Sequence, residues 1–214
     1  MGKKLENELE YYYDSHPTEE DLMGETAIHA SLVQYLILVL KWLFRGQACA
    51  IYDNLNFYQT QNPLEYPLAP DIALIKGVDY QYVTSWRIGK TGPAPQVILE
   101  IASKETWEKD INEKPIRYAT MGTEEYFVYD PNDPPNWKDT HRRLIGWRLN
   151  KARREAIEIP PDLEGRLWSD HLNSFLVPDI MYLRLYDVNN QQRLTGEEAL
   201  AQKLRSLGVN PDEL

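Results

Sequence analysis

The most informative part of the sequence reads VILEIASKETWEKDINEKPIRYATMGTEEYFVY, residues 97–129. It begins with a short apolar run, 97–102, which is typical of a buried strand. A polar segment, 103–113, leads into a helix of about two turns that ends near Gly122. Residues 125–129 are then expected to form another strand. The order strand, helix, strand predicts a parallel crossover, which is right-handed in nearly all folds.

The elements on either side extend this crossover into a mixed α/β architecture. Apolar residues recur at steps of three and four between 25 and 45, which predicts one long helix packed on the sheet. Residues 48–58 and 71–75 are expected to be strands, and 80–95 is expected to be a loop. Short β-like segments follow and predict an added antiparallel part: 144–149, 156–159 and 181–186.

We expect three segments along the chain: a polar N-terminal segment (1–14), the main domain (15–190), and a C-terminal helix and tail (191–214). The run Thr195-Gly196-Glu197-Glu198 is a capping-box signature that opens the last helix, and Gly208 closes it. Its apolar stripe is too short for a stable coiled coil, so we expect it to dock on the same domain. The stripe consists of Leu200, Leu204 and Leu207.

Length and composition fit a protein with one real core. The chain has 214 residues, of which 43% are hydrophobic and 26% charged. Its single cysteine, Cys49, excludes an internal disulfide and fits a reducing compartment. The start of the chain lacks the apolar region of a secretory signal. The longest apolar stretch, 27–44, contains three polar residues and falls short of the roughly 20 residues that span a bilayer. These features predict a cytoplasmic protein without a membrane anchor.

Glu100 interrupts the apolar run 97–102. An ionised carboxylate inside a buried strand is costly unless a partner compensates it, so this residue is a candidate functional group. The alternative is a glutamate at the strand end that faces solvent or pairs with an arginine.

Asp71 is the second candidate, although its dipeptide says little. Pro-Asp occurs four times in the chain, at Asp71, Asp162, Asp179 and Asp212. Asp71 is favoured because a helix and a strand precede it, and a strand carrying a second carboxylate follows 29 residues later.

A wider pattern of residues runs through the same region: Glu100-Ile101-Ala102-Ser103, Thr106, Asp110, Lys114, Tyr118, Gly122, Glu125-Tyr126 and Tyr129-Asp130-Pro131. It resembles the signature of the Uma2 family, bacterial proteins described as restriction endonucleases and also called the domain of unknown function 820. His29 and the C-terminal motif 207–212 match as well. The resemblance covers about residues 15–214. It implies a restriction-endonuclease-like core of the PD-(D/E)xK nuclease superfamily, with a mixed central sheet flanked by helices.

The resemblance implies a metal site and a catalytic lysine. Asp71, Glu100 and the main-chain carbonyl of Ile101 would offer hard oxygen ligands to Mg²⁺ or Mn²⁺. A standard E-x-K motif would place the lysine at 102, where this chain has Ala102, so the resemblance implies that Lys114 takes that role. Lys104 and Lys109 compete for it, and a solvated surface charge is the ordinary alternative for each.

Four further residues surround this candidate site. Asp110 is an N-cap, a partner of Lys114 or an extra metal-site acid, and we favour a structural role. Glu25 shares a helix face with His29; it is a further candidate metal ligand or a cap of the helix start. His29 is expected to support a ligand rather than to be one. Tyr118 and Tyr126 are expected to be packing residues.

Two functions from different classes follow. The first is a Mg²⁺-dependent DNA endonuclease, for which a homodimer would suit cleavage of both strands. The second is a catalytically silent relative that binds or regulates. The net charge of −10 and the absence of a lysine at 102 favour the second, because an extended DNA-binding surface would be basic. The trio Asp71, Glu100 and Lys114 favours the first.

Overall fold

The computed structural model describes residues 26–59, 66–137 and 141–213. Its centre is a six-stranded sheet in the order β1-β3-β5-β6-β7-β8. Strands β5 and β6 are parallel, and every other neighbouring pair in this sheet is antiparallel. The strands are β1 (Cys49–Tyr52), β3 (Ile72–Lys76), β5 (Val97–Ile101), β6 (Glu125–Tyr129), β7 (Leu144–Asn150) and β8 (Glu155–Glu158). The predicted mixed α/β fold class is confirmed.

The crossover between β5 and β6 consists of two short helices, α4 (Trp107–Asn112) and α5 (Lys114–Met121). Pro115 lies in the first turn of α5, where its missing N–H is tolerated. Gly122 ends this helix with a φ of 105°, a left-handed conformation that favours glycine. The predicted strand–helix–strand unit is therefore present, and the helix α4 lies within the polar segment 103–113 that was expected to precede the helix.

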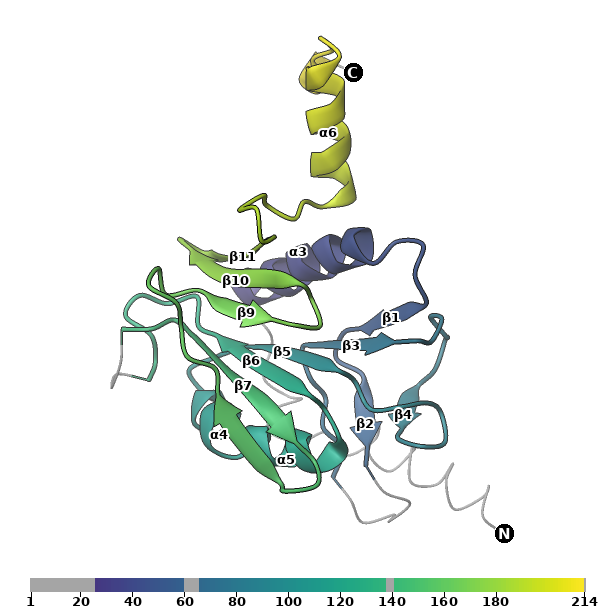
Figure 1. The fold of residues 1–214 in the computed structure, drawn as a ribbon, viewed down its shortest axis with the longest axis vertical. Coiled ribbons are helices and arrows are strands. Elements are labelled where there is room, and N and C mark those ends of the chain that lie inside the picture. The colour runs from purple at the N-terminus through teal and green to yellow at the C-terminus, as the bar shows by residue number, and fades with distance from the viewer. Residues whose placement is uncertain (1–25, 60–65, 138–140, 214) are drawn as a thin grey trace.

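The two faces of the sheet have separate cores because side chains alternate along each strand. Ile72 and Leu74 point to one face, which is covered by α3 (Ala27–Leu43) and by a second sheet, as Figure 1 shows. Ala73 and Ile98 point to the other face, which packs against α5. Thr26 caps α3 by accepting a hydrogen bond from the His29 backbone. Among the described residues, no helix combines the length and the apolar character needed to cross a membrane.

The predicted antiparallel part does not form one separate unit. Strands β7 and β8 belong to the central sheet, as its last two strands. The separate three-stranded sheet has the order β11-β10-β9, and only β11 (Tyr182–Tyr186) was expected. The strand β9 (Leu167–Ser169) was missed because it has only three residues, and β10 (Ser174–Asp179) was missed because it lacks a clear apolar alternation. A small parallel pair, β2 (Asn56–Tyr58) and β4 (Ser85–Arg87), places a strand in the segment expected to be loop.

The C-terminal helix α6 (Gly196–Ser206) begins with the predicted capping box, in which Thr195 and Glu198 bond reciprocally. It projects away from the body in Figure 1. An ideal Cβ at Gly196 would lie 2.9 Å from the Trp42 ring of α3, so the helix start contacts the domain closely. The predicted docking of the whole stripe is not seen, because Leu200 is 60% and Leu207 65% exposed. A short 3-10 turn, η1 (Pro211–Glu213), follows. The segment boundaries stay a prediction, and residues 1–14 lie outside the described part of the chain.

Candidate active site

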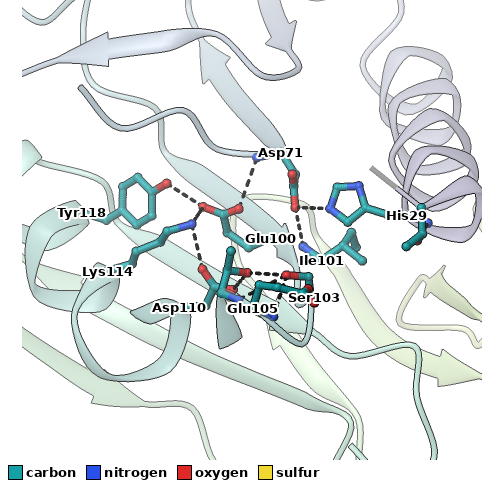
Figure 2. A network of polar contacts seen from close by, with 11 residues as sticks. His29, Asp71, Glu100, Ile101, Ser103, Glu105, Asp110, Lys114 and Tyr118 are labelled. Atoms are coloured by element: carbon teal, nitrogen blue, oxygen red, sulfur yellow. Dashed lines mark hydrogen bonds and ion pairs between the residues drawn. The ribbon is translucent and has the colours of Figure 1, made fainter. Parts of the chain in front are cut away.

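Strand pairing brings the two candidate carboxylates together. Asp71 immediately precedes β3, and Glu100 lies near the end of β5. Because β3 and β5 are antiparallel with Ile72 opposite Leu99, the start of one strand lies beside the end of the other. The Asp71 backbone N–H lies 3.4 Å from Glu100 Oε2 and donates to it (Figure 2). Asp71 and Glu100, which are 29 positions apart in the sequence, therefore form one acidic site where the ends of two inner strands meet.

Glu100 is only 4% exposed and has its partners on α5. Its Oε1 accepts hydrogen bonds from Lys114 Nζ at 2.9 Å and from the Tyr118 hydroxyl at 2.8 Å. Lys114 and Tyr118 are four residues apart, so they share one face of the helix. Both alternatives considered from the sequence, a solvent-facing glutamate and an arginine pair, are wrong. The compensating partner is a lysine delivered by the crossover.

Asp110 is the second anion that holds Lys114. The Lys114 Nζ forms a 2.7 Å ion pair with Asp110 Oδ1, and Asp110 is 1% exposed. The other carboxylate oxygen accepts a 2.9 Å hydrogen bond from Thr106 Oγ1, and the Asp110 carbonyl accepts one from the Tyr126 hydroxyl. Of the roles open to Asp110, the structure places it as the partner of Lys114. It is not an N-cap, since it lies inside α4.

Asp71 is oriented from two layers of the fold. Its Oδ2 accepts a 2.7 Å hydrogen bond from the Ile101 backbone N–H and lies 3.1 Å from His29 Nε2 on α3. The side chains of Asp71 and His29 are 17% and 14% exposed. His29 thus contacts the candidate ligand, as Figure 2 shows. A helix on one sheet face fixes Asp71, while a helix on the other face fixes Glu100.

The buried charges do not balance. Burial raises the pKa of Glu100 to about 8; Lys114 lowers it, and the nearby charges of Asp71 and Asp110 add to the rise. Burial also raises the pKa of Asp110, against the effect of Lys114. Burial by itself lowers the pKa of Lys114, but Glu100 and Asp110 outweigh it and raise that pKa above its usual value. Three acids therefore share one ammonium, and a further cation bound beside them would favour the ionised form of Glu100.

The donor set suits a hard divalent ion. Asp71 and Glu100 offer carboxylate oxygens, and Asp71 Oδ1 accepts no hydrogen bond from any other described residue. Mg²⁺ prefers such oxygens and usually retains several waters, so two carboxylates suffice. Within 26–59, 66–137 and 141–213, no group of three or more His, Cys, Asp or Glu side chains is arranged to hold a metal. Glu25, the further candidate ligand, lies outside these ranges.

The site also contains residues that the sequence placed elsewhere or left open. Of the three candidate lysines, it is Lys114 that contacts Glu100. Tyr118 and Tyr126 do pack, with ring centroids 5.0 Å apart. Tyr118 also donates a hydrogen bond to the Glu100 carboxylate, whereas Tyr126 donates to the backbone carbonyl of Asp110. The packing role predicted for Tyr118 was therefore incomplete. The i, i+4 spacing of Lys114 and Tyr118 was the signal that could have indicated its contact with Glu100.

A family model matches most of the chain. Residues 6–164 match the model of the Uma2 family, which is described as "Putative restriction endonuclease". A solved structure titled as a putative nuclease belonging to DUF820, from Anabaena variabilis ATCC 29413, is similar to the chain with 12% sequence identity and a TM-score of 0.49. The match covers 70% of this chain and 76% of that one. No curated protein matches the chain.

Proposed function

Because the chain belongs to the Uma2 family, we propose that it is a metal-dependent endonuclease that hydrolyses phosphodiester bonds in DNA. One observation carries the proposal. The pairing of β3 with β5 sets Asp71 beside Glu100, and α5 adds the Lys114 ammonium 2.9 Å from the same glutamate. Two acids and a lysine on this type of sheet are the groups that phosphodiester hydrolysis needs.

Each residue has a distinct task in this proposal. Asp71, Glu100 and the main-chain carbonyl of Ile101 would hold Mg²⁺ or Mn²⁺, and Glu25 is a further candidate. The bound ion supplies a water of lowered pKa and offsets charge on the scissile phosphate. His29 keeps Asp71 oriented through the 3.1 Å contact with its Oδ2.

Lys114 acts as a fixed cation rather than as a base. Glu100 and Asp110 keep it protonated because both raise its pKa. A protonated ammonium cannot accept the proton of an attacking water, but it stabilises negative charge that develops on the phosphate. Asp110 therefore serves the site by holding Lys114 in place.

A second candidate function is a catalytically silent protein that binds nucleic acid or regulates a partner. The observation that favours it is the double engagement of Lys114, whose ammonium is shared between Glu100 and Asp110 at 2.9 and 2.7 Å. A lysine held by two buried acids has less freedom to contact a phosphate. The net charge of −10 also disfavours an extended DNA-binding surface.

Plasmid nicking separates these candidates. Wild-type protein is incubated with supercoiled plasmid and Mg²⁺ or Mn²⁺ beside Glu100→Gln and a matched control, Glu158→Gln, whose side chain is 46% exposed on β8. We expect wild type and Glu158→Gln to nick, Glu100→Gln to lose at least about 100-fold in rate, and chelator to stop the reaction. Equal nicking by all three would assign the activity to a contaminant or another site. Folded protein that binds DNA without cutting it would favour the silent candidate.

The oligomeric state determines whether one or both strands of the duplex are cut in one binding event. A homodimer would place two sites on one duplex and yield linear plasmid, whereas a monomer yields nicked circles first. Light scattering on the same preparation gives the mass to compare with 25.0 kDa per chain.

A further inference from the structure

The two carboxylate oxygens of Glu100 have different neighbours. Its Oε1 receives two short hydrogen bonds from α5, one from Lys114 and one from Tyr118. Its Oε2 faces the start of β3, where the Asp71 backbone N–H lies 3.4 Å away. Figure 2 shows Lys114 and Tyr118 on one side of Glu100 and Asp71 on the other. One oxygen is saturated by donors, and the other is directed toward the second acid.

We propose that Tyr118 is a positioning residue that holds Glu100 so that Oε2, and not Oε1, serves as the metal ligand. This inference rests on the proposed metal-dependent function of the site. Tyr118 donates its hydroxyl to Oε1 and thereby sets the rotation of the carboxylate. A ligating carboxylate that is itself hydrogen-bonded binds its metal more tightly, because its orientation need not be restricted when the ion arrives.

Tyr118 is better suited to this task than Lys114. The tyrosine ring is fully buried, stands on α5 and packs against the Tyr126 ring at 5.0 Å. A ring side chain has two rotatable bonds, so its hydroxyl is held in place by packing. The lysine has a longer, more flexible stem and divides its ammonium between Glu100 and Asp110. The tyrosine therefore determines the geometry of Glu100, and the lysine contributes charge.

The chain offers a matched pair of variants for the test. Tyr118→Phe removes the hydroxyl that reaches Glu100, and Tyr126→Phe removes a hydroxyl that reaches only the Asp110 carbonyl. Both rings are fully buried, and each variant loses one hydrogen bond worth about 1 kcal/mol. The midpoint temperature of thermal unfolding, Tm, should therefore fall by a similar amount in both variants. Any difference between them in metal binding reports the contact with Glu100.

Metal binding is measured directly by titrating each purified protein with Mn²⁺ and following free Mn²⁺ by electron paramagnetic resonance. We expect Tyr118→Phe to raise the Mn²⁺ Kd about tenfold and Tyr126→Phe to leave it near the wild-type value. Nicking assays over a range of Mn²⁺ concentrations should agree. The concentration for half-maximal rate should rise in Tyr118→Phe, while the rate at saturating Mn²⁺ stays within about threefold of wild type.

Three outcomes would overturn the inference. An unchanged Kd in Tyr118→Phe shows that Lys114 alone orients Glu100, and the proposed nuclease function survives that result. Equal rises in both tyrosine variants show a structural effect of hydroxyl loss on the packed rings. Failure of the wild type itself to bind Mn²⁺ removes the metal site, and then the metal-dependent function falls together with this inference.

Discussion

The charge balance of the site predicts a large, pH-dependent loss of stability in Lys114→Met. Methionine approximates the length of the lysine stem but carries no charge, so the buried acids Glu100 and Asp110 lose their shared cation. Removing one member of a buried ion pair costs about 3–5 kcal/mol. Burial raises the pKa of both acids, so protonation removes part of the uncompensated charge. We therefore expect a loss near the lower end, about 3 kcal/mol at pH 7.

The direction of the pH dependence follows from the two carboxyl groups. Lys114 lowers the pKa of both, so its removal raises their folded-state pKa values further above those of the unfolded chain. The folded variant then retains protons that the unfolded chain releases above about pH 4.5, and each such group destabilises the fold as pH rises through that window. The difference from wild type grows with pH wherever the folded variant keeps a proton that folded wild type has released. For Asp110 this begins above its wild-type folded pKa, and for Glu100 it begins only near pH 8. Lys114 is protonated in both states over this window and adds no slope.

Urea unfolding followed by tryptophan fluorescence at pH 5 and pH 8 measures this difference, with Lys104→Met as the control because Lys104 is exposed. For a chain of this length, about 3 kcal/mol corresponds to roughly 6–12 °C in Tm. Adding Asp110→Asn to Lys114→Met should restore part of the loss. The reasoning is refuted if Lys114→Met resembles Lys104→Met at both pH values, or if its loss is larger at pH 5.

Two further predictions concern groups outside the site. Glu125 is buried and accepts hydrogen bonds from the Ser169 hydroxyl and the Asp170 backbone N–H. Glu125→Gln should therefore lower the free energy of unfolding, measured in urea, by about 2 kcal/mol. A decrease under about 0.5 kcal/mol would contradict this. Burial raises the pKa of the Cys49 thiol to about 11, against the lowering effect of Lys76. Alkylation of Cys49 by iodoacetamide at pH 7.5 should therefore be about 100-fold slower than alkylation of an ordinary thiol. Mass spectrometry follows the reaction, which should accelerate about tenfold per pH unit up to pH 9.5, and a rate equal to that of a free thiol would show an unperturbed group.

Several elements could be predicted because their signals are local. The helix α3 follows from apolar residues at steps of three and four, and the crossover 97–129 follows from its order of apolar run, helix and apolar run. Glu100 could be selected for the same reason, since a charge inside a short apolar strand is unusual in the sequence itself. The role expected for Lys114 came from the family resemblance, and its contact with Glu100 is present in the structure.

Other features depend on contacts between segments that are distant in sequence. The strands β9 and β10 gain their hydrogen bonds from neighbours in the second sheet, so their own residues carry little periodic pattern. Tyr118 resembles any buried aromatic residue until the fold sets its hydroxyl on Glu100. The three roles open to Asp110 could be narrowed only by the position of α5 relative to α4.

Asp71 is a residue whose place in the site could not be identified from the local sequence pattern. Four Pro-Asp dipeptides are equivalent as local patterns, and in the structure Asp179 ends the hairpin strand β10 while Asp162 pairs with Arg166 in a turn. Of the three Pro-Asp aspartates whose side chains the structure describes, Asp71 is the one set beside Glu100, because β3 pairs antiparallel with β5. The sequence by itself determined the periodic elements and the unusual buried charge, since both are written in neighbouring residues. The tertiary structure decided which acid, which lysine and which tyrosine meet that charge, because strand register and helix placement are properties of the whole chain.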